Sequence, residues 1–173
     1  MDYRHPLEPG IVKFLDETET VQGAGFLVAD DLVCTCAHVV SAALSLADDG
    51  PPPEHTEVLI DFPFLGAIRA TATVMHWTPE SEGDVAVLRL TSQRPAGARA
   101  VRLLSTVALT GRRVEFLGYP VGNDAGGWSD ARLGRRRSDG SVQPRASGPR
   151  DTRSSEGSAE HRCGTSPLSL SSA

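Results

Sequence analysis

The sequence lacks the features that would carry it into or across a membrane. No apolar run approaches the roughly 20 residues that a membrane-spanning helix needs, and residues 1–6 contain no apolar core of a secretion signal. Cysteine is also scarce: there are three, and two of them are separated by a single residue, which makes a poor disulfide framework. Such thiols stay reduced inside cells. We therefore expect a cytoplasmic protein with no membrane contact.

An excess of positive charge is missing too. The chain has 17 Lys and Arg residues against 22 Asp and Glu, which gives a net charge of −5. A protein that binds nucleic acid usually has a dense cluster of basic residues on one face. The Arg135-Arg136-Arg137 triplet is a local exception, but it lies in a stretch rich in Ser and Gly without interleaved aromatic residues. Such a run is typical of a solvated segment. We expect no nucleic-acid partner, and a tail that binds nucleic acid is a third possible function with little support in the sequence.

Segments with a helical period are nearly absent from the first 133 residues. Short segments that are β-branched or alternate in polarity are separated there by turn residues, as in an antiparallel sandwich or barrel. One short helix is predicted at about 37–46, and the Asp-Asp-Gly-Pro-Pro-Pro run at 48–53 is predicted as a surface loop because proline lacks an amide donor. The predicted strands lie near 11–15, 25–28, 32–36, 57–62, 68–76, 85–90 and 114–118, with a further candidate at 128–133.

The character of the sequence changes at Leu133. Up to that residue there are 10 basic against 18 acidic residues, and beyond it there are 7 against 4. Of the last 40 residues, 25 are Ser, Arg, Gly or Pro, so this segment has too little apolar surface to offset the entropy of ordering it. We predict that 134–173 is a disordered tail. Because the change is abrupt, an out-of-frame reading of the gene is a further hypothesis for it.

A histidine stands at the corner between a predicted strand and the predicted helix. Residues 23–40 read Gly-Ala-Gly-Phe-Leu-Val-Ala, an Asp-Asp turn, and Leu-Val-Cys-Thr-Cys-Ala-His-Val-Val. This segment resembles the pattern Gly-x-Gly-Phe-Leu-Val, turn, Leu-Thr-Ala-Ala-His-Val-Val of bacterial trypsin-like serine peptidases. The resemblance implies that His38 is the general base of a Ser-His-Asp triad.

A second motif follows, with its aspartate 46 residues after His38. Residues 83–90 read Gly-Asp-Val-Ala-Val-Leu-Arg-Leu, which is similar to the Asp-Ile-Ala-Val-Leu-x-Leu strand of the same family. The resemblance implies that Asp84 orients the histidine. An imidazole accepts the serine proton only as the correct tautomer, which a buried carboxylate on its other nitrogen enforces. The order and the spacing of the two motifs agree with the family.

The catalytic serine of the family has no recognisable counterpart. Residues 111–133 resemble the start of the family's second barrel, but the later Gly-x-Ser-Gly motif does not occur in the chain. The nearest candidate, Ser158, lacks both the glycine two residues before it and the Gly-x-Pro after it. The resemblance covers residues 9–133. It implies an all-β fold, an antiparallel β-barrel of the trypsin type, with a complete first barrel at about 9–105 and a truncated second barrel at about 111–133.

The leading interpretation is the N-terminal part of a trypsin-like serine endopeptidase. The family cleaves proteins or peptides with its triad, and that mechanism implies neither a metal nor a cofactor. Without a nucleophile, and without the second-barrel groups that stabilise the oxyanion, we expect this chain to be inactive by itself. The alternative interpretation is a pseudo-protease that binds a protein partner without cleaving it.

A zinc site at the same histidine is an alternative interpretation. Cys34, Cys36 and His38 alternate in the sequence, so on one strand their side chains would share a face, and Cys and His are common zinc ligands. No fourth ligand is evident, and neighbouring positions on one extended strand rarely surround a tetrahedral ion. Cysteine also serves as a small buried hydrophobic residue, and this interpretation is favoured for both cysteines.

Overall fold

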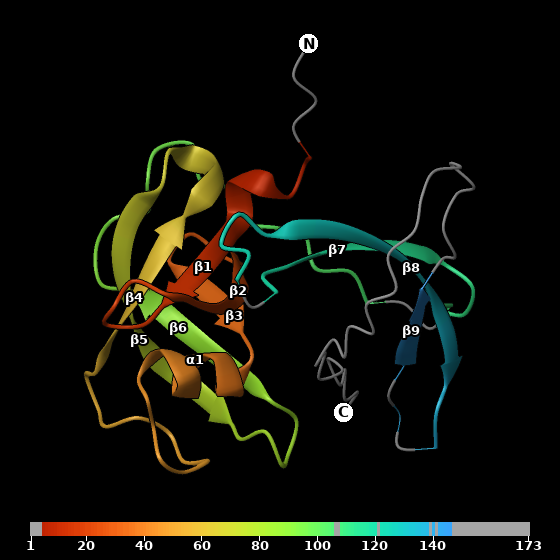
Figure 1. The fold of residues 1–173 in the computed structure, drawn as a ribbon, viewed down its shortest axis with the longest axis horizontal. Coiled ribbons are helices and arrows are strands. Elements are labelled where there is room, and N and C mark those ends of the chain that lie inside the picture. Colours follow the sequence, from red (N-terminus) through yellow and green to blue (C-terminus); the bar gives the residue numbers. More distant parts are fainter. Residues whose placement is uncertain (1–4, 106–107, 121, 139, 141, 147–173) are drawn as a thin grey trace. The chain divides into compact units, whose positions relative to one another are not determined.

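A closed antiparallel barrel of six strands forms the first part of the chain in the computed structural model (Figure 1). The structure describes residues 5–105, 108–120, 122–138, 140 and 142–146. Neighbouring strands follow the order β1-β2-β3-β6-β5-β4, and β4 closes the barrel by pairing with β1. The bounds are β1 (Ile11–Leu15), β2 (Val21–Leu27), β3 (Leu32–Thr35), β4 (Glu57–Phe62), β5 (Ile68–Thr78) and β6 (Val85–Leu90).

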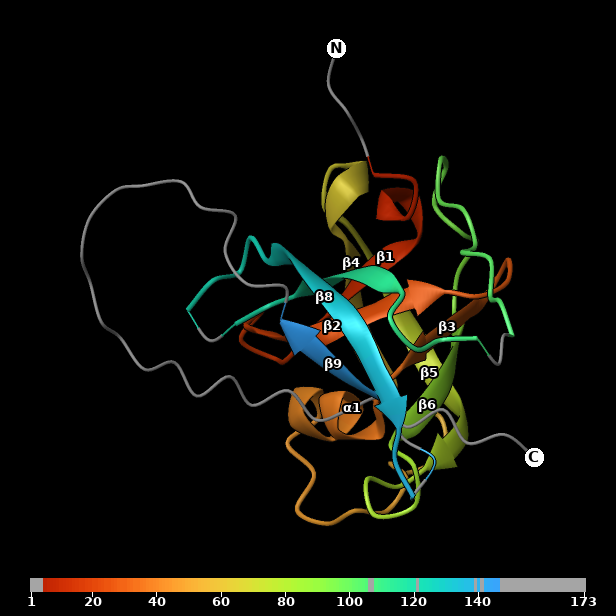
Figure 2. The same cartoon turned by 90° about the vertical axis from the view of Figure 1, so that its right-hand side faces the viewer.

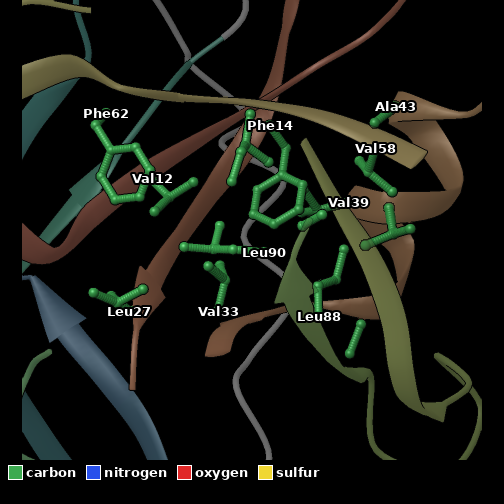
Figure 3. Close-up of a cluster of buried hydrophobic side chains, with 14 of the residues drawn as sticks. Val12, Phe14, Leu27, Val33, Val39, Ala43, Val58, Phe62, Leu88 and Leu90 are labelled. Atoms are coloured by element: carbon green, nitrogen blue, oxygen red, sulfur yellow. The ribbon is translucent and has the colours of Figure 1, made fainter. Parts of the chain in front are cut away.

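The alternation of side chains along the strands places an apolar core inside this barrel. In β6, Ala86, Leu88 and Leu90 are buried while the residues between them are more exposed, which is the period of two that a strand imposes. Figure 3 shows Phe14 amid the labelled core side chains. The fully buried residues of largest volume are Phe14, Phe62, Leu27, Ile60, Leu88, Val12, Val33, Val40 and Val58.

One short helix, α1 (Ala37–Ala43), lies against this barrel, and two 3-10 turns, η1 (Glu8–Gly10) and η2 (Pro63–Leu65), complete the unit. A β-carbon on Gly23 would lie 2.7 Å from a methyl group of Val39, so only glycine lets the helix approach β2 this closely. A β-carbon on Gly25 would lie 2.7 Å from the Phe14 ring. The two glycines therefore fix the position of α1 and the packing beneath it.

A separate unit, residues 106–173, contains an antiparallel sheet of three strands (Figure 2). Its strands are β7 (Arg113–Gly118), β8 (Gly127–Arg136) and β9 (Val142–Ala146), in the order β7-β8-β9. Among its described residues, Ala131 is the one buried hydrophobic side chain, whereas Phe116 and Trp128 are 41% and 38% exposed. This sheet has little core of its own in the part of the chain that the structure describes.

The predicted all-β barrel fold is confirmed, with local differences in its elements. The predicted helix ends earlier, at Ala43, and β2 begins earlier, at Val21. The predicted tail differs more: β8 continues to Arg136, which places Arg135 and Arg136 in a strand, and β9 lies wholly beyond Leu133. Residues 147–173 of that tail lie outside the described residues. Within the described part of the chain, no helix has the length and the apolar composition that crossing a membrane requires.

Candidate active site

His38 lies where strand β3 passes into helix α1. β3 ends at Thr35, Cys36 keeps an extended backbone with φ −79° and ψ 145°, and the helix begins at Ala37. The helix turns four of its seven residues into the core. His38 is not among them, and its side chain is 40% exposed. The imidazole is therefore fixed by a buried helix and still reachable from solvent.

Asp84 is held by a tight loop between β5 and β6. The amides of Glu82, Gly83 and Asp84 all donate hydrogen bonds to the carbonyl of Pro79, at 2.9, 3.1 and 2.9 Å. Asp84 has a φ of 57°, in the left-handed region that Asp adopts more readily than most residues. It is only 8% exposed. The loop thus places a buried carboxylate directly before β6.

The two predicted partners are in direct contact. Nδ1 of His38 lies 2.6 Å from Oδ2 of Asp84, and the backbone N–H of His38 donates to Oδ1 of the same carboxylate at 3.0 Å. An ionised carboxylate only accepts hydrogen bonds, so with such a partner Nδ1 would be the donor and Nε2 the ring nitrogen left to accept a proton. This geometry can hold an imidazole in one tautomer. The catalytic roles assigned to the two residues stay predictions.

Asp49 reaches the Asp84 loop from a different part of the chain. Its Oδ1 accepts a hydrogen bond from the amide of Glu80 at 3.0 Å, and its Oδ2 accepts one from the Ser81 hydroxyl at 2.9 Å. The indole N–H of Trp77 donates to the Asp49 carbonyl at 3.2 Å. The Glu80 amide, followed by the Ser81 hydroxyl, lowers the pKa of the Asp49 carboxyl. Sequence reasoning placed Asp49 in a surface loop and missed this contact, because no local pattern links residues 31 positions apart.

Cys36 also faces the pair. Burial, with the nearby charge of Asp84 as a smaller cause, raises the pKa of its thiol to about 12. Ligand atoms of Cys36, His38 and Asp84 lie within 4.8 Å of one another. The zinc site suggested by the sequence differs, because it consists of Cys34, Cys36 and His38 on one extended strand and lacks Asp84. In the structure the helix begins before His38, so the chain turns between Cys36 and His38.

A nucleophile is not found beside this pair within the barrel unit. Among residues 5–105, no serine or threonine hydroxyl is hydrogen-bonded to the ring of His38. Ser158, the rejected candidate, lies outside the described residues. An open pocket of about 390 Å³ is lined by Asp30, Asp31 and residues 92–98, and neither His38 nor Asp84 lines it.

Comparison with protein families gives one match that covers most of the chain. The family described as trypsin-like peptidase domain matches residues 23–172. The match begins at the first glycine of the histidine motif and includes both predicted motifs. It also continues past Leu133, where the resemblance noted on the sequence ended. The comparison with curated proteins found no match.

Solved structures of serine proteases share the fold. The inactive form of Rv3671c from M. tuberculosis, as a serine-to-alanine mutant, is 25% identical with a TM-score of 0.53, and the match covers 79% of this chain and 63% of that one. A second structure of that protease is 28% identical with a TM-score of 0.52, covering 75% of this chain and 54% of the other. Neuropsin, a serine protease of mouse brain, is 14% identical with a TM-score of 0.57, covering 84% and 73%. The chain therefore spans less than two thirds of the length of the Rv3671c structures.

Proposed function

The chain belongs to the trypsin-like peptidase family, and on that premise we propose that it carries two members of a Ser-His-Asp triad but no nucleophile. His38 is the general base, and Asp84 supplies the carboxylate that orients it. The observation that carries this proposal is the 2.6 Å contact between Nδ1 of His38 and Oδ2 of Asp84. In a triad this contact fixes the tautomer, leaves Nε2 to take the serine proton and stabilises the imidazolium that results.

Peptide hydrolysis needs more than this pair. A hydroxyl must lie within hydrogen-bond reach of Nε2 to attack the carbonyl carbon, and preorganised donors must stabilise the oxyanion that forms. The sequence has no Gly-x-Ser-Gly motif, and within residues 5–105 no hydroxyl is bonded to the His38 ring. We therefore propose that the chain does not cleave proteins or peptides on its own, and that hydrolysis requires a nucleophile supplied from elsewhere.

A peptidase assay tests the missing nucleophile. The purified chain is compared with its His38→Ala variant on fluorescent casein, with trypsin as the positive control. Because a base without a nucleophile adds nothing to the reaction, we expect the two proteins to give the same background rate. A wild-type rate above that of His38→Ala would show that the chain contains a working nucleophile.

The tautomer of His38 tests the roles of the pair without any activity. Nitrogen-15 NMR distinguishes a ring protonated at Nδ1 from one protonated at Nε2, at a pH where the ring is neutral. We expect the proton on Nδ1 in the wild type. In Asp84→Asn the amide can donate, which allows the other tautomer, as in triads with this change. A wild-type ring protonated at Nε2 would contradict the proposed base.

A binding module is the second candidate function. Leu103 and Leu104 follow the barrel and are 69% and 79% exposed, and adjacent exposed apolar side chains are found at protein-binding surfaces. Translation of the encoding DNA in all three frames separates the two candidates. A Gly-x-Ser-Gly-x-Pro motif in another frame beyond codon 125 would favour a split peptidase. Its absence, with a soluble and monodisperse chain, would favour the binding module.

The limits of the domain belong to the same proposal. We place the peptidase domain at 9–133, with its first barrel ending near residue 105, and a tail at 134–173 that includes the last residues of β8 and all of β9. Limited proteolysis with mass spectrometry tests this: early cuts confined to 134–173 agree with it, and equally early cuts within 111–133 do not.

We also place the chain in the cytoplasm, because Cys34 and Cys36 are free thiols that a reducing compartment preserves. Recovery with secreted proteins would contradict that location.

A further inference from the structure

We propose that Cys36, His38 and Asp84 form a binding site for a zinc ion. One ligand atom of each residue lies within 4.8 Å of the other two. Together they offer a sulfur, an imidazole nitrogen and a carboxylate oxygen, which are the three ligand types that Zn²⁺ takes in proteins. Magnesium and calcium prefer sites made of oxygen atoms, so the thiol selects against them. The site goes beyond the triad, which uses no metal.

The local fold brings the three ligands together from two parts of the chain. Cys36 has the extended backbone that precedes α1, and His38 is the second residue of that helix, so the two side chains are not held on one strand face. Asp84 comes from the loop before β6. Its carboxylate accepts a hydrogen bond from the His38 backbone, and ligand atoms of Cys36 and Asp84 lie within 4.8 Å of each other. Asp84 therefore faces both of the other ligands before any ion binds.

Charge and access favour a cation at this place. The carboxylate of Asp84, which lies within 4.8 Å of the Cys36 sulfur, can supply negative charge to the ion. Asp84 is 8% exposed, which shields its carboxylate from solvent, whereas the side chain of His38 is 40% exposed. The open side at His38 allows an ion to enter and water to take the fourth position, as in zinc sites with three protein ligands.

Zinc replaces protons that the site now holds. The thiol proton of Cys36 goes to solvent, and the neutral imidazole moves its proton from Nδ1 to Nε2, so each ion releases one proton. Nδ1 and Oδ2 are 2.6 Å apart, whereas two ligands of one tetrahedral zinc ion are about 3.3 Å apart at bond lengths near 2 Å. The exposed imidazole must therefore turn away from the carboxylate by a fraction of an ångström.

Occupancy of the site would switch off the proposed general base. With zinc on Nδ1 and the proton on Nε2, the ring of His38 has no lone pair left to accept a proton from a serine. This consequence rests on the proposed function, whereas the site itself does not. The two are tested separately, because metal binding is measured without any peptidase activity.

Cobalt absorption tests the ligand set. Co²⁺ is added to the reduced full-length chain carrying Cys163→Ser, which leaves two thiols, and the charge-transfer band of a thiolate–cobalt bond is recorded and then displaced by Zn²⁺. We expect one equivalent of ion and a band that persists in Cys34→Ser, the matched control two residues away. Cys36→Ser should remove the band, and Asp84→Asn should weaken binding at least about tenfold. No thiolate band, or a band lost in Cys34→Ser and kept in Cys36→Ser, would overturn the proposal.

Alkylation of the unaltered chain keeps the test independent of any variant. Iodoacetamide modification of Cys34 and Cys36 is followed by mass spectrometry, with Zn²⁺ and then with a chelator in excess. We expect Zn²⁺ to slow the modification of Cys36 several-fold, to leave that of Cys34 unchanged, and the chelator to reverse the effect. Equal slowing of both cysteines, or no slowing of Cys36, would contradict a site at Cys36.

Discussion

The barrel unit and the three-stranded sheet differ in how much apolar surface each encloses. Fifteen buried hydrophobic residues form one cluster inside the barrel and beneath α1. In the sheet, Ala131 is the one buried hydrophobic residue among those described, and Phe116 and Trp128 each leave more than a third of their surface exposed. Both His38 and Asp84 belong to the barrel unit. The part of the chain with its own core is thus also the part that can hold the candidate triad residues in place.

Hydrogen exchange should show the largest difference between the two units. Amides in the core strands of a stable unit exchange only when it unfolds, whereas a sheet with little core opens locally. We expect the slowest amides of β1 and β6 to be protected by at least about 5 kcal/mol, and those of β7 and β9 by less than about 2 kcal/mol. Equal protection in both units would show that the sheet is supported as well as the barrel.

Removal of one aromatic ring from each unit sharpens the same comparison. Phe14 is fully buried, so Phe14→Ala should lower the free energy of unfolding of the barrel by about 3–5 kcal/mol. Phe116 is 41% exposed, and Phe116→Ala should cost less than about 1 kcal/mol. Each unit contains one tryptophan, Trp77 in the barrel and Trp128 in the sheet. Fluorescence-monitored denaturation of Trp128→Phe and Trp77→Phe variants therefore reports on the two units separately, and similar losses for both phenylalanines would contradict the comparison.

Removal of the buried Asp84 carboxylate should cause the next largest loss in the free energy of unfolding. Asp84→Ala removes the acceptor of two hydrogen bonds from His38 and leaves alanine at a φ of 57°, so we expect a loss of about 2–3 kcal/mol. In the sheet, Asp130 forms an ion pair with Arg113 at 2.9 Å that is about half exposed. Asp130→Asn should change the free energy of unfolding by less than about 0.5 kcal/mol. Denaturant titration measures both, and a loss for Asp84→Ala as small as for Asp130→Asn would mean that the pair adds nothing to the barrel.

We expect the smallest effect from Asp49, whose substitution should change the stability of the protein only at acid pH. The pKa of Asp49 in the folded chain is below its ordinary value of 3.8, chiefly because its carboxylate accepts the Glu80 amide. The contribution of Asp49 to the free energy of unfolding is complete above that ordinary pKa, and it is lost as the pH falls through the lowered pKa. Asp49→Asn should therefore flatten the stability profile below pH 4, whereas Asp48→Asn, whose side chain accepts the Gly50 amide in its own loop, serves as the control. Identical profiles of stability against pH for Asp49→Asn and the wild type would show that Asp49 does not stabilise the loop that contains Asp84.

The sequence predicted the strands of the barrel in which apolar and polar residues alternate. Strand β6 alternates apolar residues in the manner of a half-buried strand, and its bounds agree with the prediction. By contrast, Gln22-Gly23-Ala24 has no apolar pattern. Gly23 and Ala24 are in β2 because they pair with Phe14 and Lys13 of β1, and Gln22 lies at the irregularity in that pairing. Strand β9 contains Pro144, which argues against a strand, but it lies at the edge of its sheet, where a missing amide donor is tolerated.

The candidate site was predictable only where a motif carried it. His38 and Asp84 lie in two recognisable motifs, and their contact follows from the pairing of β3 with β6, which joins Thr35 to Ala86. The contact of Asp49 with Glu80 and Ser81 joins two loops, and loops carry no periodic signal that reveals such a contact. The predicted helix already separated Cys36 from His38, and the structure begins that helix at Ala37. The proximity of Cys36 to Asp84 was not predicted, because no motif links a cysteine at this position to the loop before β6.

Labelling with a fluorophosphonate probe tests the central claim most directly. The probe forms a covalent bond only with an activated serine, so it reports a working triad whatever its substrate. The purified full-length chain is treated with the probe beside its His38→Ala variant and trypsin, and intact mass is measured. We predict that trypsin is labelled and that neither form of this chain is. A labelled serine in the wild type that is unlabelled in His38→Ala would contradict the claim that the chain holds a base and an orienting acid without a nucleophile.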